Sequence, residues 1–276
     1  MHFRQFVLLI AVTGLIVLAA DRVQAEHEGK VQILLLGDST TEASIPKKLL
    51  PQGPQLEDVI RQLLAAEKDL PPTNVMNLGL SGEYIRRLLD SERYDRLASK
   101  LPGLDFVLIR YGLNDNARRE NFAENFPKDY HELINRLKTD HPRATIIVTT
   151  VIPYLDEATS QRLNDLNRQV AKAENVRLFD IYPRYAEELK RGPDMLNYRR
   201  YPLEKIPENR REFVKPYLSA DNPPLVEVLD NRLDVHFGHL PGWYSDRHPN
   251  HAGYHVIGDE TAKYLTPLIR EKFVKP

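Results

Sequence analysis

The sequence predicts an α/β protein in which a parallel β-sheet lies between two layers of helices. Short apolar runs alternate along the chain with longer amphipathic segments, an order typical of strand–helix–strand units joined by right-handed crossovers. The chain has 276 residues and contains no internal repeat or low-complexity tract. Once an N-terminal leader is set aside, about 250 residues remain, and this length suits a single domain of that class.

Five apolar runs have the length and composition of buried strands. Each of them is followed closely by a glycine, a proline or a polar residue. The predicted strands cover residues 31–36, 74–78, 104–111, 144–151 and 176–179.

The amphipathic segments between these runs are predicted to be helices. In the first of them, apolar side chains recur at the spacing of one helix face, at Leu56, Val59, Ile60, Leu63 and Leu64. The predicted helices cover residues 55–68, 84–101 in one or two pieces, 126–140, 158–174 and 250–273.

Residues 183 to about 243 interrupt this alternation. They have no clean helical or strand period, and prolines recur among two Arg-Arg pairs and several tyrosines. A structureless loop of that length is rare in a compact domain, so we expect a folded insertion or a lid. Two interpretations of this segment remain open: an added surface structure with short helices, or a segment that recognises substrate.

Residues 1–25 have the three-part layout of a secretory signal peptide. A short basic start precedes an apolar stretch over 6–20, and small residues stand where a signal peptidase would cleave. The stretch is short for a membrane span, although an N-terminal anchor is the alternative. We therefore expect residues 26–276 to form one exported domain, secreted or periplasmic, with no stable membrane span after cleavage.

Composition excludes several classes of partner and site. The 38 basic and 39 acidic side chains give a net charge near zero, which predicts no nucleic-acid partner. The chain contains no cysteine, so disulfides, lipid-modified cysteine and thiolate metal sites are impossible. Export without disulfides fits a bacterial periplasm or exterior.

Polar and glycine residues that could build an ester-cleaving site follow the first three predicted strands. Ser39 follows the first strand in a Gly-Asp-Ser turn, Gly82 lies just beyond the second, and Asn114 follows the third. The carboxyl ends of parallel strands share one edge of the sheet, where ligands gather. A serine hydroxyl could act there as nucleophile, while the Ser39 and Gly82 amides and the Asn114 side chain stabilise an oxyanion.

The segment before the last helix offers the remaining groups that acyl transfer needs. His248 could serve as the base, and Asp246 could orient its imidazole. Each residue also has a purely structural interpretation. Ser39 or Asp38 could cap a helix, and Asn114 could belong to an ordinary turn.

Taken in order, these segments resemble the four sequence blocks of the GDSL-type, or SGNH, hydrolases. The blocks are Gly37-Asp38-Ser39, Gly82, Gly112-Leu113-Asn114-Asp115 and His248. The resemblance implies a flavodoxin-like three-layer sandwich with a central five-stranded parallel sheet of order 2-1-3-4-5. It also implies Ser39 as nucleophile, His248 as base, an oxyanion hole from Ser39, Gly82 and Asn114, and hydrolysis without metal or cofactor.

The sequence departs from that family at the carboxylate. The usual acid stands three residues before the histidine, where this chain has Ser245, and Asp246 lies only two residues before His248. A turn can bring either spacing within reach, so Asp246 is our preferred orienting group. The alternatives are a serine–histidine dyad held by a backbone carbonyl or water, and a carboxylate from the insertion such as Asp230 or Asp234.

Histidines are frequent in the last fifth of the chain, and two of them have a spacing that can bind zinc. His251 and His255 are four residues apart on the last predicted helix, but no obvious third ligand accompanies them. We predict solvated helix-face histidines and no metal site.

The sequence therefore predicts an exported serine esterase with a small-molecule or polysaccharide ester as substrate. Short acyl groups on carbohydrate, acetyl above all, are the expected target. Two alternatives remain open: a lysophospholipase or thioesterase acting on lipid acyl chains, and a non-catalytic relative that binds glycans.

Overall fold

Five parallel strands form the central sheet of this protein. The structure is a computed structural model that describes residues 29–192 and 195–274, so the predicted signal peptide lies outside the described residues. The strands are β1 (Val31–Gly37), β2 (Thr73–Asn77), β3 (Phe106–Arg110), β4 (Thr145–Thr149) and β5 (Arg177–Phe179). Their order is β2-β1-β3-β4-β5, which confirms the predicted fold.

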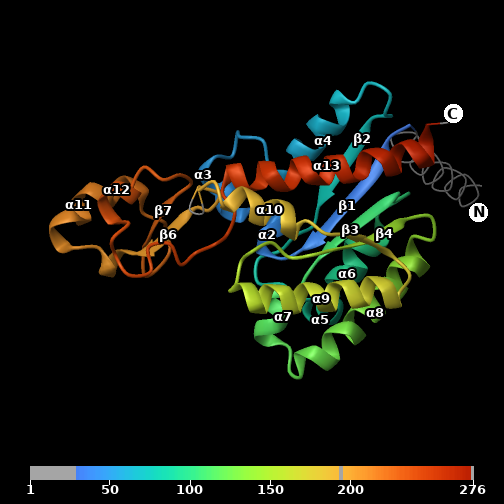
Figure 1. Cartoon of the computed structure of the whole chain (residues 1–276), viewed down its shortest axis with the longest axis horizontal. Helices are drawn as coiled ribbons and strands as arrows, with labels where there is room; N and C mark the ends of the chain where they lie inside the picture. The colour runs from blue at the N-terminus through green and yellow to red at the C-terminus, as the bar shows by residue number, and fades with distance from the viewer. Residues whose placement is uncertain (1–28, 193–194, 275–276) are drawn as a thin grey trace, which may run out of the picture.

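Helices cover both faces of the sheet (Figure 1). One face is covered by α4 (Leu56–Ala66), α10 (Tyr182–Leu189) and α13 (His251–Phe273), the other by α5 (Ile85–Asp90), α8 (Phe122–Asp140) and α9 (Glu157–Ala173). Strand β1 shows why both layers form. Ile33 and Leu35 are buried in the core beneath α4 and α13, whereas Leu34 and Leu36 are buried in the core beneath α5 and α8, because successive side chains of a strand point to opposite faces.

Short helices follow strands β1 and β3 at the carboxyl edge of the sheet. The sequence did not indicate most of them, because segments of four to six residues contain too few apolar positions to show a period. They are α2 (Ser39–Glu42), α3 (Ser44–Leu49) and α7 (Leu113–Arg118). The helix expected over 84–101 is broken into α5, α6 (Arg93–Arg96) and the 3-10 turn η1 (Ala98–Lys100).

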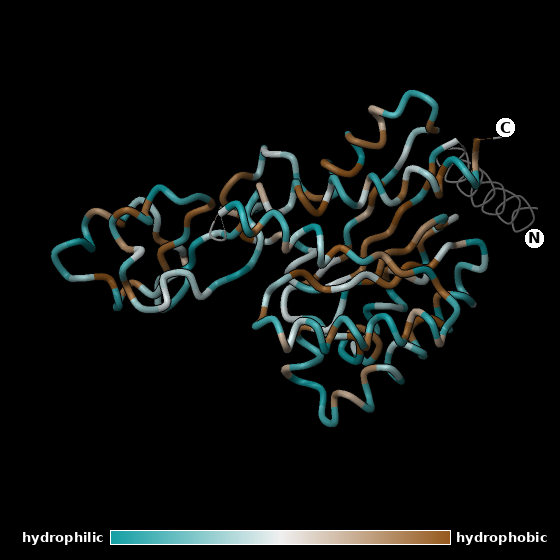
Figure 2. The backbone as a smooth tube through the Cα atoms, viewed as in Figure 1, coloured by the Kyte–Doolittle hydropathy of each residue, from teal (hydrophilic) through white to brown (hydrophobic). Residues whose placement is uncertain are grey.

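The insertion folds as a lobe beside the sandwich (Figure 1). Its strands β6 (Arg199–Pro202) and β7 (Leu225–Val228) pair antiparallel. Around them lie η2 (Leu203–Lys205), η3 (Glu208–Arg210), α11 (Arg211–Val214), η4 (Lys215–Tyr217) and α12 (Asp234–Phe237). The lobe has its own apolar core, which includes Tyr201, Val226, Phe237 and Trp243, and hydrophobic segments are visible within it in Figure 2.

The expected start of the irregular insertion at residue 183 was wrong. Residues 182–189 form the regular helix α10, whose buried Tyr185 belongs to the core beneath α4 and α13. The prolines at 183 and 193 obscured this helix in the sequence, although a proline in the first turn is compatible with a helix. Among the helices described, none is both long enough and apolar enough to span a bilayer.

Candidate active site

Ser39 stands at the first position of α2, directly after β1 ends. The buried Asp38 caps this helix, since its Oδ1 accepts hydrogen bonds from the Thr40 amide at 2.9 Å and from the Thr40 hydroxyl at 2.8 Å. Gly37 permits the sharp turn, because a Cβ there would lie 2.2 Å from Thr41 Oγ1 and 2.8 Å from the Arg110 carbonyl oxygen. The Ser39 amide lies in the first helical turn, where N–H groups have no partner within the helix.

A buried arginine at the end of β3 donates hydrogen bonds to this turn. Arg110, the last residue of β3, donates hydrogen bonds to the Thr40 carbonyl and to Thr41 Oγ1. Burial lowers the pKa of Arg110, although the nearby charge of Asp38 works against that shift. Tyr254 of α13 adds a hydrogen bond from its hydroxyl to the Ser39 carbonyl at 3.1 Å. The serine backbone is thus held from both the sheet and the last helix.

The structure brings Ser39, His248 and Asp246 into one chain of hydrogen bonds. Ser39 Oγ lies 2.8 Å from His248 Nε2, and His248 Nδ1 lies 2.6 Å from Asp246 Oδ1. An ionised carboxylate can only accept, so Nδ1 carries the proton and Nε2 is left to accept from the serine hydroxyl. This is the tautomer that a histidine base requires.

Asp246 remains ionised although its side chain is only 9% exposed. Burial acts to raise its pKa, but the hydrogen bonds from His248 and the charge of Arg200 outweigh burial and hold the pKa below its ordinary value. Arg200 Nε lies 2.9 Å from Asp246 Oδ2. The carboxylate therefore has one oxygen on His248 and the other on an arginine that comes from the insertion.

The insertion also determines the position of the His248 loop. The Tyr198 amide donates to the His248 carbonyl at 3.2 Å, and Asn197 forms an isolated bridge with Pro249. The Tyr198 ring stacks on the imidazole at 5.6 Å between centroids, while Tyr154 meets it edge-on at 4.8 Å. The Tyr154 hydroxyl is 3.2 Å from His248 Nδ1. Two tyrosines therefore restrict the orientation of the imidazole.

Gly82 and Asn114 line the same pocket as Ser39 and His248. This pocket has a volume of about 360 Å³, within the range of small-ligand sites. Gly82 has a φ of +74°, a left-handed conformation that favours glycine. Asn114 Nδ2 donates to the Glu83 carbonyl at 3.1 Å, which uses one of its two N–H bonds. All four residues singled out for nucleophile, base and oxyanion hole thus meet in one cavity.

Asp115 ties the two segments that carry Gly82 and Asn114. Its Oδ1 accepts from the Ile85 amide and its Oδ2 from the Gly112 amide, both at 3.0 Å. Burial raises the pKa of Asp115 to about 7, against the lowering effect of the Ile85 hydrogen bond. The carboxyl is completely buried, so its proton is linked to folding.

We expect Asp115 to make stability depend on pH. The carboxyl titrates near pH 4 when unfolded and near 7 when folded, so the folded state holds its proton longer. Its contribution is therefore fully present below pH 4 and is lost as pH rises toward 7, by at most about 1.4 kcal/mol per unit. Urea unfolding of the wild type and of Asp115→Asn at pH 4.5, 6 and 8 measures this. The stability advantage of the wild type over the variant should shrink with rising pH, and a constant difference would contradict the assignment.

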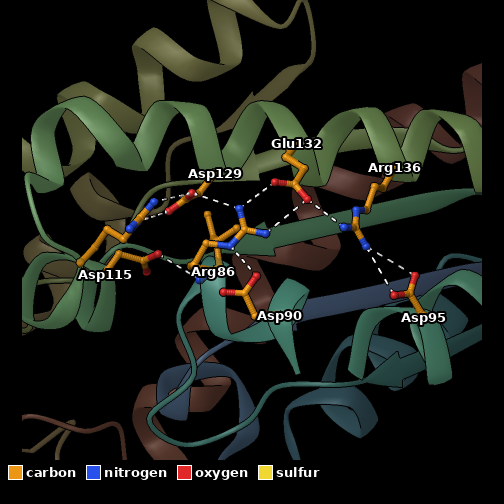
Figure 3. A network of polar contacts seen from close by, with 9 residues as sticks. Arg86, Asp90, Asp95, Asp115, Asp129, Glu132 and Arg136 are labelled. Carbon is orange, nitrogen blue, oxygen red and sulfur yellow. Dashed lines mark hydrogen bonds and ion pairs between the residues drawn. The ribbon is translucent and has the colours of Figure 1, made fainter. Parts of the chain in front are cut away.

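Ion pairs hold these segments against α8 (Figure 3). Arg86 of α5 lies 2.7 Å from Glu132 and 3.6 Å from Asp129, and Arg119, directly after α7, lies 2.6 Å from Asp129. Asp129 is almost fully buried. One carboxylate of α8 therefore contacts arginines from both segments that reach the pocket.

The other candidate carboxylates lie elsewhere. Asp234 pairs with Arg199 at 2.7 Å and accepts from Trp243 Nε1 at 2.7 Å within the lobe, and Asp230 pairs with Arg232 at 2.5 Å. Sequence reasoning missed the contacts of Tyr154, Tyr198 and Arg200 with His248 and Asp246. The Arg-Arg pair at 199–200, which lies among tyrosines, could have indicated a role at the site. No pattern in the sequence distinguished it from two exposed arginines of a surface loop.

His251 and His255 do not join a metal centre in the described part of the chain. Among residues 29–192 and 195–274, no three histidine, aspartate or glutamate side chains are grouped as metal ligands would be. Burial and the neighbouring His255 lower the pKa of His251.

The strand order places this protein in the class of flavodoxin-like α/β proteins. At the carboxyl edge of its sheet, a serine, a histidine and an aspartate are joined by hydrogen bonds, as in hydrolases of that class. The model of the GDSL-like lipase/acylhydrolase family matches residues 35–256. The chain belongs to that family, and the resemblance inferred from its sequence blocks is confirmed. A search of curated proteins finds no match.

Solved structures of the same fold include three hydrolases. A lipase/acylhydrolase from Enterococcus faecalis has 19% identity and a TM-score of 0.54, covering 86% of this chain and 96% of that one. LAE5, an α/β hydrolase enzyme from the metagenome of Lake Arreo, has 20% identity and a TM-score of 0.52 over 86% and 96%. Axe2, an acetylxylan esterase from Geobacillus stearothermophilus, has 18% identity and a TM-score of 0.52 over 85% and 94%.

Proposed function

We propose that this protein is an exported serine esterase that removes short acyl groups, acetyl above all, from carbohydrate. The observation that supports it best is the hydrogen-bond chain from Ser39 through His248 to Asp246, which opens into a pocket lined by Gly82 and Asn114. This arrangement offers a nucleophile, a base, an orienting acid and oxyanion donors within one cavity.

The proposed reaction has two steps. His248 Nε2 takes the proton of Ser39 Oγ as the oxygen attacks the ester carbonyl carbon. The resulting oxyanion accepts hydrogen bonds from the Ser39 and Gly82 amides and from Asn114. The protonated imidazole then gives its proton to the leaving alcohol oxygen, which releases the alcohol and leaves an acyl-enzyme. Water repeats the sequence and frees the acid.

Acetylated carbohydrate is proposed as substrate from two observations. The pocket is small, and tyrosines 154, 198 and 254 line it, which suits packing against a sugar ring. Axe2, which has the same fold, is an acetylxylan esterase, and variants described as its catalytic mutants replace a serine and an aspartate. Export is proposed from the basic and apolar layout of residues 1–25.

A chain-length series of 4-nitrophenyl esters, with acetylated xylo-oligosaccharides beside it, tests this proposal. We expect the highest kcat/KM on acetate, release of acetate from the sugar, and loss of both in Ser39→Ala. A preference for long acyl chains would support a lipid-directed hydrolase instead. A folded protein that turns over no ester but binds glycans would contradict the enzymatic function.

The proposed oxyanion hole predicts the effect of removing Asn114. We expect Asn114→Ala to lower kcat about 100- to 1000-fold with little change in KM, because an oxyanion donor acts mainly in the transition state. Asn116→Ala is the matched control: Asn116 lies on the same short helix, and its Oδ1 accepts from Arg162. Equal kcat values for the two variants would contradict the role of Asn114.

A further inference from the structure

Two guanidinium groups converge beside Gly82, and within residues 29–192 and 195–274 neither of them forms an ion pair. Arg118 Nη1 donates to the Gly82 carbonyl at 3.0 Å, and Arg87 Nη1 lies 3.5 Å from the same oxygen. The position that a Gly82 Cβ would occupy is 3.5 Å from both terminal nitrogens of Arg118 and 3.7 Å from Arg87 Nη1. The space beside this glycine is therefore bordered by arginine nitrogens.

Three neighbouring arginines on the same segments are ion-paired. Arg86 pairs with Glu132, Arg93 with Glu83, and Arg119 with Asp129. In the part of the chain that the structure describes, Arg87 and Arg118 have no carboxylate oxygen within 4.0 Å. A single carbonyl uses few of the five N–H bonds of a guanidinium, so most donors of both side chains remain for a ligand.

The charge of the pocket wall favours an anion. Arg118 and Arg200 both line it, while no aspartate or glutamate is among its lining residues. Two carboxylates border the pocket and both have partners. Asp246 is shared between His248 and Arg200, and Glu42 Oε2 accepts from the amide of Ser81 at 2.6 Å. Planar guanidinium groups bind carboxylate or sulfate oxygens in pairs, and more strongly than neutral acceptors.

We infer that the carbohydrate ester bound here carries an anionic group, a carboxylate or a sulfate, which Arg118 and Arg87 hold beside the oxyanion hole. The inference rests on the proposed function and deepens it. Because an acetyl group has no charge, the anion belongs to the sugar. Binding at Gly82 places the charged part of the sugar next to the amide that would receive the oxyanion, so that an ester on the same ring reaches Ser39.

Three substrates acetylated at the same hydroxyl test this inference: a methyl glucuronoside, the corresponding methyl glucoside, and the primary-alcohol sulfate of that glucoside. We expect kcat/KM about ten- to a hundredfold higher on at least one charged sugar than on the glucoside, the size of a charge-assisted contact. The preferred anion identifies carboxylate or sulfate. The ratio should fall as KCl is raised, because salt screens exposed charges.

Variants locate the effect. Arg118→Gln keeps a donor for the Gly82 carbonyl but removes the charge, and we expect it to bring the charged-to-neutral ratio to within about threefold of one. Arg118→Lys should keep part of the preference. Arg143→Gln is the matched control, since this exposed arginine precedes β4 at the opposite edge of the sheet. A wild-type ratio near one, or a ratio that survives in the Arg87→Gln/Arg118→Gln protein, would overturn the inference.

A binding measurement separates this inference from the proposed function. Calorimetric titration of Ser39→Ala with the unacetylated methyl glucuronoside, methyl glucoside and glucoside sulfate does not depend on turnover. Tighter binding of a charged sugar that disappears with Arg118→Gln supports the anion site even if no ester is hydrolysed. Equal binding of all three sugars overturns it even if acetate is released.

Discussion

Replacing Ser39 by alanine is expected to lower kcat/KM on 4-nitrophenyl acetate by about 10⁵- to 10⁶-fold, the size seen when a hydrolase loses its nucleophile. Among the described residues, the Tyr154 hydroxyl is the other hydroxyl within hydrogen-bond distance of His248 Nε2, at 3.4 Å. Ser39 Oγ is 2.8 Å from His248 Nε2, whereas the nearby Ser44 hydroxyl is 3.2 Å from Ser81 Oγ. The remaining activity would come from the oxyanion donors acting on a bound water.

Ser99→Ala is the matched control for this loss. Its hydroxyl donates to the Asp95 carbonyl at 2.9 Å and is exposed at the opposite side of the sheet from the pocket. Steady-state rates of both variants, together with their circular dichroism, separate chemistry from folding. A Ser39→Ala protein that retains more than about one-hundredth of the wild-type rate would refute Ser39 as nucleophile.

Asp246→Asn is expected to lower kcat by about 10³- to 10⁴-fold, as in a hydrolase whose orienting aspartate is replaced. Asparagine cannot accept on both sides at once. Arg200, 2.9 Å from one aspartate oxygen, can only donate, so the amide oxygen would face Arg200. The N–H bonds would then face His248 Nδ1, which lies 2.6 Å from the other aspartate oxygen. The imidazole would lose the tautomer that leaves Nε2 as a base.

Asp230→Asn tests the alternative carboxylate at the same time. Asp230 pairs with Arg232 within the lobe, so its replacement should change kcat less than about twofold. If Asp246→Asn kept most of the wild-type rate, the packing of Tyr154 and Tyr198 would be sufficient to orient His248, and the proposed triad would be wrong.

The turn at Gly37-Asp38-Ser39 could be predicted from the sequence because the residues that determine it are all local. The apolar run from Val31 ends at Gly37, Asp38 caps the next turn, and Ser39 follows. The ends of β2 and β3 were equally readable, because parallel strands of similar length end at one edge. The sequence therefore placed Ser39, Gly82 and Asn114 at one edge before any contact between them was known.

The boundaries of the short helices and of the insertion were harder to predict from the sequence, for a physical reason. Helices such as α2, α3 and α7 have four to six residues, too few for periodic burial. In the lobe, buried residues come from strands, turns and short helices spread between Tyr201 and Trp243, so no single period describes them.

By itself, the sequence determined the sheet, the order of the family blocks and the identities of Ser39 and His248 as the groups to bring together. Asp246 reaches His248 from two residues away through a local turn, since its Oδ1 accepts from the His248 amide at 3.1 Å as well as from Nδ1 at 2.6 Å. Only the tertiary structure decided what holds that turn beside Ser39. The chain near His248 pairs with residues 196–198. The Asn250 amide donates to the Leu196 carbonyl, and the Tyr198 amide donates to the His248 carbonyl. That backbone pairing, with Arg200 on the second carboxylate oxygen, comes from about fifty residues earlier in the chain. A contact over that separation leaves no local pattern, so spacing alone could not show it.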